Sequence, residues 1–469
     1  MPGKLRVLFV DAINPAVEVE SRYPSLGMAY LVSAARKALP GEIEFKIAGR
    51  DVQSVAESFK PHVVGISSVS QNFNIANDYA GYFSQKGTAV VMGGVHISAI
   101  PGCLPDGAAA ACLGESEETF VELIKAYLGG GFSPETLAGI SGIAFREGGE
   151  IKLTAPRPQI QNMDNIAMPA RNLLDIQPHT YMFTSRGCPY RCTFCSSTRF
   201  WDKLRFFSAE YVVDEIGLLV RDYGVSMISF FDDLFAANTK RLEEIAVLLE
   251  KRGLNGKVKY TCSCRANVVK PELAKILKRL GVVSVGMGLE SGDEETLKYL
   301  KGGTVNVAHN SRAIEVLKSA GIAANASFVI GSPDETFEQS MKTYNFIRKS
   351  RLDLFDIYLL TPYPGTPVWD YAKRRGLVSD DMDWSRLDVN VYREPGKAII
   401  LSETMKKEEV FSLYKRFRRL RFRRNLVKVF NHPMRRDLPM MAWKLFKEKV
   451  SALAESRQHD IKRNFNRHE

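Results

Sequence analysis

The sequence of 469 residues lacks a continuous apolar run of the roughly 18 residues that a membrane-spanning helix needs. It also lacks the long apolar stretch and cleavage site of a secretory signal, because residues 1–12 lead directly into a strand-like segment. With 45% hydrophobic and 25% charged residues, the composition is that of an ordinary globular protein. At about 100 to 200 residues per domain, the length predicts two to four domains. We therefore expect a cytoplasmic, multidomain protein.

Cysteine is too scarce for a disulfide framework, because the chain has only seven cysteines and the number is odd. Three of them, Cys188, Cys192 and Cys195, lie within eight residues, and the other four are scattered. In an intracellular chain of this size, such a cluster is more typical of a metal-binding or catalytic site than of a disulfide.

Acidic residues are absent between Lys415 and Lys428, where eight Lys or Arg residues contribute to a net charge of +11. Such a patch can bind nucleic acid, acidic lipid surfaces or anionic substrates. No recognised nucleic-acid module accompanies the charge, so the sequence does not favour nucleic acid. Residues with spacing three, among them Phe411 and Phe417, form one apolar face. This basic helix can therefore cover a neighbouring domain or make a peripheral membrane contact, and both hypotheses stay open.

The pattern of apolar segments predicts an α/β fold with four regions. Residues 1–130 alternate five strand-like runs with helices, which indicates a doubly wound domain. Residues 131–180 read as a linker with one hairpin that turns at Gly148 and Gly149. Residues 181–395 contain six strand–helix units, as in a parallel (β/α)6 partial barrel, and residues 396–469 read as a helical, basic C-terminal region. Functional residues should lie where the parallel strands end.

The cysteine cluster follows the first strand of the predicted barrel, with the spacing C-x3-C-x2-C over residues 188–195. Three thiolates on one loop can bind three corners of a [4Fe–4S] cluster and leave the fourth iron open to a ligand. A structural zinc site would need a fourth Cys or His, and His179 is poorly placed because it precedes the strand. A zinc knuckle and three unconnected thiols remain the alternatives.

This loop, with Phe194 before the last cysteine, resembles the signature of the radical S-adenosylmethionine superfamily. The resemblance implies that the open iron chelates S-adenosylmethionine, whose reductive cleavage yields a 5′-deoxyadenosyl radical. It also implies a cofactor role for polar or small residues at the strand ends, where the alternative for each is a local turn. Where many members carry Gly-Gly-Glu, this sequence has two aspartates. The residues expected to bind S-adenosylmethionine are Phe194, Asp232, Asp233, Arg265, Glu290, Ser291 and Gly331.

The first domain resembles the cobalamin-binding, Rossmann-like module that precedes the barrel in one branch of this superfamily. Small residues at its strand ends would let a corrin ring approach the backbone. The Asp-x-His-x-x-Gly motif is absent, so no histidine of that loop is expected below the cobalt, and His96 is expected at the corrin edge or in its own turn. A generic α/β domain is the alternative. The residues expected to bind cobalamin are Leu26, Gly27, Ser67, Ser68, Gly93, Gly94, His96, Gly114 and Glu115.

Together the resemblances imply a cobalamin-dependent radical enzyme that methylates an unactivated carbon of a small molecule or lipid, reduced by a donor such as flavodoxin or ferredoxin. A cyclase or carbon-skeleton rearrangement with the same cofactors is the first alternative. An iron–sulfur protein that binds RNA or lipid through its basic region is the second. Cys262 and Cys264 share one face of a strand, where they are buried or reach substrate, and Tyr363 faces substrate or packs in a turn.

Overall fold

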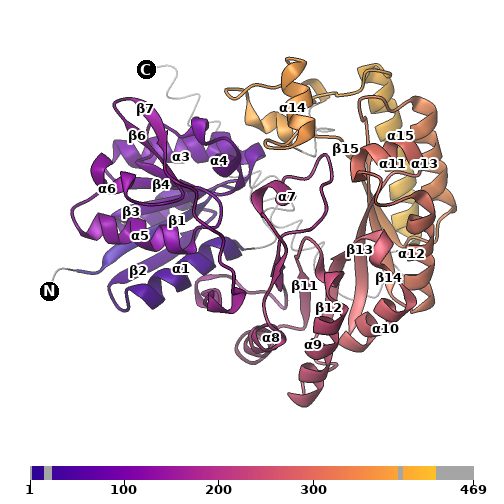
Figure 1. Ribbon diagram of the computed structural model, residues 1–469, viewed down its shortest axis with the longest axis horizontal. Coiled ribbons are helices and arrows are strands. Elements are labelled where there is room, and N and C mark those ends of the chain that lie inside the picture. Colours follow the sequence, from indigo (N-terminus) through magenta and orange to yellow (C-terminus); the bar gives the residue numbers. More distant parts are fainter. Residues whose placement is uncertain (1–2, 15–23, 389–394, 429–469) are drawn as a thin grey trace.

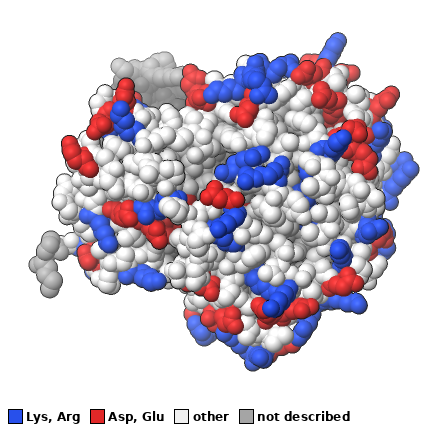
Figure 2. Space-filling model, in the orientation of Figure 1, with Lys and Arg blue, Asp and Glu red and all other residues white. Residues whose placement is uncertain are grey.

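In the computed structural model, residues 3–14, 24–388 and 395–428 are described, with side chains up to residue 424 (Figure 1). Two α/β units lie side by side, and the segment that carries α7 (Ser197–Phe200) lies between them (Figure 1). Positive and negative side chains are interspersed over the face in Figure 2, so the net charge of +11 forms no single-sign patch across this face. In the described ranges, no helix is long and apolar enough to cross a membrane.

The first unit is built on a seven-stranded sheet with the order β2-β1-β3-β4-β5-β6-β7. Its five parallel strands are β1 (Leu5–Asp11), β2 (Ile43–Ala48), β3 (Val63–Ser67), β4 (Ala89–Gly93) and β5 (Ala110–Cys112). Strands β3, β4 and β5 are almost entirely apolar because both faces of the sheet are covered, whereas β2 at the sheet edge alternates apolar residues with the exposed Glu44 and Lys46. Val7 and Phe9 pack against α1 (Leu26–Ala38) and α5 (Glu117–Leu128), whereas Leu8 and Val10 pack toward α2 (Val52–Phe59) and α3 (Phe73–Gln85).

The hairpin expected in the linker belongs to this sheet. Strands β6 (Ile143–Glu147) and β7 (Glu150–Leu153) pair antiparallel beside β5. Gly148 and Gly149 form its turn with φ of 60° and 88°, the left-handed conformation that a two-residue hairpin turn requires. The segment 131–180 therefore contributes two strands to the first unit before it crosses to the second.

The second unit is a six-stranded parallel sheet in sequential order, which confirms the predicted partial barrel. Its strands are β8 (His179–Met182), β11 (Met227–Phe230), β12 (Lys259–Cys264), β13 (Val282–Glu290), β14 (Ala323–Ile330) and β15 (Leu354–Leu359). The helices between them are α8 (Ala209–Tyr223), α9 (Thr239–Lys251), α10 (Pro271–Leu280), α11 (Glu294–Lys301), α12 (Val307–Ser319) and α13 (Phe337–Lys349). All strand C-termini therefore face one side of the barrel.

Two further helices close the structure. Helix α14 (Pro367–Arg374) and the following turn place Trp369 and Trp384 against the α3 side of the first unit. Helix α15 (Lys407–Lys428) packs on β15 and α13 through Phe411, Tyr414 and Phe417, which are buried. In its described part, the apolar face predicted for the basic helix therefore covers the barrel.

Candidate cofactor sites

The cysteine loop follows β9 (Ser185–Arg186) at the C-terminal end of the first barrel strand. Cys192 is buried, Cys188 and Cys195 are partly exposed, and none of the three forms a disulfide. Gly187 has φ of 93°, and a Cβ there would lie 2.5 Å from the Lys203 carbonyl oxygen, so only glycine fits. On the other side, the Thr193 amide donates to the Leu300 carbonyl at 3.1 Å. Glycine is thus required where the loop begins, and one backbone hydrogen bond links Thr193 to Leu300.

Arg265, at the end of β12, reaches the middle of this loop. Its Nη1 donates to the Cys192 sulfur at 3.1 Å, and its guanidinium lies 3.9 Å from the centroid of the Tyr190 ring. A guanidinium therefore lies against one of the three sulfurs that could bind iron. The buried Nε of Arg265 has no hydrogen-bond partner among the described residues. The loop therefore fits an iron–sulfur cluster, and Arg265 keeps one donor for a further anionic ligand.

The two aspartates after β11 have different surroundings. Asp232 is buried and accepts hydrogen bonds from the Thr184 amide at 2.6 Å and the Ser185 hydroxyl at 2.8 Å, so it holds the chain that leads into the cysteine loop. Asp233 instead lines a cavity and accepts from the Ser197 hydroxyl at 2.5 Å. Burial raises the pKa of both carboxyls above the usual value. Of the two, only Asp233 is placed to face a cofactor.

Glu290 and Ser291 also have different surroundings. Glu290 is buried with φ of 60°, and its carboxylate lies 2.8 Å from the Lys301 ammonium, which in turn lies 5.9 Å from the Phe194 ring centroid. A buried, left-handed glutamate is strained, a state that clusters at functional sites. Ser291 is fully buried and accepts a hydrogen bond from the Asp293 amide at 3.0 Å. This contact is that of a local turn, which was the alternative to a cofactor role for the strand-end residues.

Gly331 has φ of 86°, and its amide donates to the Glu335 carboxylate at 2.8 Å. Glu335, which the sequence did not single out, also accepts from the Ser332 amide and the Ser340 hydroxyl. Burial raises its pKa to about 7. In the described part of the chain, no three His, Cys, Asp or Glu side chains converge as ligands of a single metal ion.

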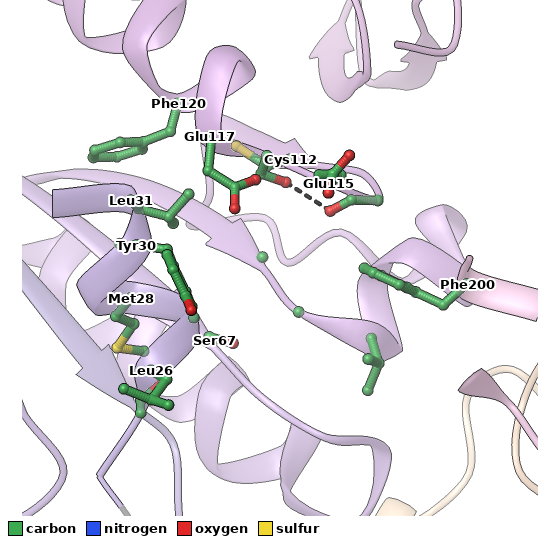
Figure 3. A pocket seen from close by; sticks show the side chains of 18 of the residues that line it. Leu26, Met28, Tyr30, Leu31, Ser67, Cys112, Glu115, Glu117, Phe120 and Phe200 are labelled. Carbon is green, nitrogen blue, oxygen red and sulfur yellow. Dashed lines mark hydrogen bonds between the residues drawn. The ribbon is translucent and has the colours of Figure 1, made fainter. Parts of the chain in front are cut away.

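A cavity of about 490 Å³ opens where the strand ends of the two units meet (Figure 3). The first unit lines it with Phe9, Met28 and Phe120, which lie deep between the sheet and its helices. The barrel contributes Phe231 and the cysteine-loop flank, including Arg186 and Trp201. Most residues predicted to contact cobalamin line this cavity: Leu26, Gly27, Ser67, Gly93, Gly94, Gly114 and Glu115.

The backbone of the cavity is shaped for close approach. Gly94 has φ of 98°, and a Cβ there would lie 2.7 Å from the Ser68 carbonyl oxygen. A Cβ added at Gly93 or at Gly27 would meet no atom of the described residues within 4 Å, so both glycines leave open space toward the cavity. A large, flat ligand can therefore lie directly on the strand ends, which fits a corrin ring.

His96, expected at the corrin edge or in its own turn, does not line this cavity. Its ring is fully buried 4.0 Å from the Phe73 centroid and 4.3 Å from the Trp384 centroid. Its Nδ1 lies 3.1 Å from the Ser70 hydroxyl, and burial lowers its pKa to about 4. Ser68 is likewise buried outside the cavity lining. Cys262 and Cys264 are buried in the barrel core.

Comparisons with known proteins agree with this geometry. The family model of the radical SAM superfamily matches residues 182–347, and that of the B12 binding domain matches residues 15–124. An uncharacterized methyltransferase of Pyrococcus horikoshii is 34% identical over 77% of this chain and 81% of its own length. The anaerobic magnesium-protoporphyrin IX monomethyl ester cyclase of Cereibacter sphaeroides is 29% identical over 88% of this chain and 70% of its own length.

Among solved structures, the radical S-adenosylmethionine methyltransferase TsrM of Kitasatospora setae, with cobalamin and a [4Fe–4S] cluster bound, has a TM-score of 0.66 at 18% identity. The match covers 80% of this chain and 76% of that one, and it supports the fold. The fold and its two sites define a radical S-adenosylmethionine enzyme. The chain belongs to the cobalamin-binding-domain-containing radical S-adenosylmethionine family, whose cofactors are a [4Fe–4S] cluster, S-adenosylmethionine and cobalamin.

Proposed function

We propose that this enzyme methylates an unactivated carbon of its substrate. The observation that carries the proposal is one cavity with two kinds of wall. Glycine-rich strand ends of the first unit form one wall, and the flank of the cysteine loop forms the other. When bound, cobalamin supplies a transferable methyl group, and the cluster with S-adenosylmethionine supplies a radical that abstracts hydrogen. A substrate carbon between the two walls would be within reach of both.

Named residues of the chain would bind the cluster and S-adenosylmethionine. We propose that Cys188, Cys192 and Cys195 hold the cluster and that Asp233, Arg265, Glu290, Phe194 and Gly331 surround S-adenosylmethionine. Asp232 and Ser291 act behind them by fixing loops. Aromatic side chains on the barrel rim, such as Phe231 and Trp201, exclude water from the cavity, which protects a reactive intermediate from side reactions.

We also propose that the cobalamin-binding unit extends through the hairpin to residue 153, because β6 and β7 complete its sheet. Its cofactor contacts are the seven cavity-lining residues predicted from the sequence, without Ser68 and His96. An external reductant of the flavodoxin or ferredoxin type would deliver the electron.

Cyclisation is the second candidate because the cyclase of Cereibacter sphaeroides aligns over 88% of this chain. The two reactions differ in the fate of the methyl group. Holoenzyme would be incubated with methyl-deuterated S-adenosylmethionine and either a small-molecule or a lipid extract, with Cys192→Ala as the control. Methylation predicts a product that carries the deuterated methyl group and is missing in the control. A product that needs intact Cys192 but carries no label would contradict methylation and favour cyclisation or rearrangement.

A lipid substrate would agree with a peripheral membrane contact of α15. Its outward side carries Lys415, Arg419 and Arg423 around Phe422, whose side chain is 65% exposed. A cationic face with an exposed aromatic residue suits the surface of an anionic bilayer. We expect the protein to float with vesicles that contain phosphatidylserine but not with pure phosphatidylcholine vesicles, and Arg419→Glu with Arg423→Glu to abolish flotation. Equal flotation of the double variant would contradict this contact.

A further inference from the structure

Two arginines on the barrel side grip one carboxylate of the first unit. Arg186 in β9 and Arg205 in β10 (Arg205–Phe206) are direct antiparallel partners. Arg186 Nη1 donates to Glu115 Oε1 at 2.5 Å, and Arg205 Nη1 donates to Glu115 Oε2 at 2.8 Å. Arg186 Nη2 also donates to Glu117 Oε1 at 2.6 Å. We call Arg186, Arg205, Glu115 and Glu117 the arginine clasp.

The clasp joins the two loops that border the cofactor cavity. Arg186 stands two residues before Cys188, and the rigid Gly187 separates them. Glu115 follows Gly114 in the loop after β5, and Glu117 begins α5. Arg186 and both glutamates line the cavity, where Glu115 and Glu117 lie across from Leu26 and Met28 (Figure 3). A displacement of either loop would therefore reach the other through the clasp.

The clasp is poorly explained as a source of stability. Its four side chains are each at most 10% exposed, and burying four charged groups carries a desolvation penalty that often exceeds the attraction between them. Two arginines opposite each other on a ribbon also repel. The arrangement instead fixes the orientation of the Arg186 side chain. The Arg186 fork bridges two carboxylates, and its guanidinium lies 5.2 Å from the Tyr30 ring centroid and 5.5 Å from that of Trp201.

We propose that Arg186 is a positioning residue that couples the two cofactor sites, so that filling the cavity orders the cysteine loop. The inference rests on the proposed assignment of the cavity to cobalamin. A corrin ring against Gly114 would fix the β5–α5 loop that carries both glutamates. Because the Arg186 guanidinium binds both glutamates, a fixed loop would also hold Arg186 in place, and with it the cluster ligand that follows in the sequence. A lysine keeps the charge but cannot bridge both carboxylates, so it breaks the coupling.

Anaerobic hydrogen–deuterium exchange of the cluster-loaded enzyme, with and without hydroxocobalamin, tests the coupling. In the unmodified chain, we expect hydroxocobalamin to slow exchange over residues 183–196 by about 5-fold or more, the lower end of typical coupling between sites. In Arg186→Lys and in Glu117→Gln, we expect this effect to disappear at a hydroxocobalamin concentration that saturates each variant, because both residues line the cavity and either change can also weaken binding. Lys318→Gln is the control, because it breaks the Lys318–Asp353 pair, which does not line the cavity. It should keep the full effect even if its thermal midpoint falls.

Each outcome decides a different point. Protection of residues 183–196 that survives in both clasp variants would overturn the coupling and leave the proposed function intact. The same holds if Lys318→Gln loses the effect together with the clasp variants, because general destabilisation then explains it. Failure of the unmodified chain to retain hydroxocobalamin would overturn the cavity assignment, and the coupling with it.

Discussion

The guanidinium of Arg265 donates a hydrogen bond of 3.1 Å to the sulfur of Cys192, across 73 residues of sequence. The sequence predicted Cys192 as a cluster ligand and, through the family resemblance, Arg265 as a residue that binds S-adenosylmethionine. The structure adds a contact with the thiol, and the buried Nε of Arg265 has no hydrogen-bond partner among the described residues. We therefore propose that Arg265 lies where the cluster and S-adenosylmethionine would meet.

We expect Arg265→Met to keep the cluster but to reduce S-adenosylmethionine cleavage by roughly 10- to 100-fold, the usual loss when an outer partner of a metal ligand is removed. The readouts are iron content and 5′-deoxyadenosine formation. Arg279→Met is the matched control, because Arg279 pairs with Glu250 on the exposed outside of the barrel. Unchanged cleavage in Arg265→Met would refute a role for this guanidinium.

Loss of one predicted cluster ligand should remove the cluster. Cys192→Ala is expected to lower iron content and S-adenosylmethionine cleavage by about 100-fold or more, beyond the loss caused by an outer partner. Cys103→Ala is the control, since Cys103 is a partly exposed thiol outside the cysteine loop that donates to the Asp380 carbonyl. Equal iron content in both variants after anaerobic reconstitution would contradict the ligand assignment.

Substitutions at two neighbouring glycines distinguish the effect of backbone strain from the effect of filling the cavity. Gly94→Ala should lower the free energy of unfolding by about 1–3 kcal/mol, because alanine is strained at φ of 98° and its Cβ would collide with the Ser68 carbonyl. Gly93→Leu has open space at its Cβ and should instead fill the cavity, which weakens retention of hydroxocobalamin with little loss of stability.

Urea unfolding and a desalting assay measure these two effects. The assignment of the cavity would be contradicted if Gly93→Leu retained hydroxocobalamin as well as the unmodified chain does. Gly27→Ala serves as a control for stability, because its Cβ would also meet no described atom within 4 Å.

Two buried groups give opposite dependences of stability on pH. The pKa of His96 is lowered from 6.5 to about 4, so between these values the unfolded chain binds a proton that the folded chain does not. Stability therefore falls as the pH falls through this window, by about 3 kcal/mol at most. The pKa of Glu335 is raised from 4.5 to about 7, so between these values the folded chain holds a proton that the unfolded chain does not. The contribution of Glu335 to the stability of the protein is therefore lost as the pH rises through that window.

Because the two effects offset each other, variants must reveal them. Glu335→Gln should show a steeper loss of stability from pH 7 to 4 than the unmodified chain, and His96→Gln a shallower one, in urea titrations at several pH values. Parallel profiles for all three proteins would show that neither group is buried as the structure has it.

The elements and the cysteine loop could be predicted because their signals are local. Apolar runs such as residues 7–10 and 63–66 mark buried strands, and the spacing of Cys188, Cys192 and Cys195 marks a ligand loop without reference to the rest of the chain. The fold class and the cofactors were accordingly confirmed.

The remaining features depend on which distant segments meet. Nothing near Arg186 in the sequence indicates that its side chain reaches Glu115, 71 residues away. The direction of His96 was also hidden, because the helix after Gly94 could turn its ring toward the cavity or toward Trp384. The hairpin at Gly148 was recognised from its turn, but its pairing beside β5 is a tertiary choice.

The central claim is that one chain holds cobalamin and a [4Fe–4S] cluster with one open iron around a shared cavity. The most direct test is anaerobic reconstitution with iron, sulfide and hydroxocobalamin, followed by desalting, an ultraviolet–visible spectrum and an assay of S-adenosylmethionine cleavage under reduction. We predict a retained corrin spectrum together with 5′-deoxyadenosine. A sample that contains a full cluster but retains no corrin and forms no 5′-deoxyadenosine would contradict the account.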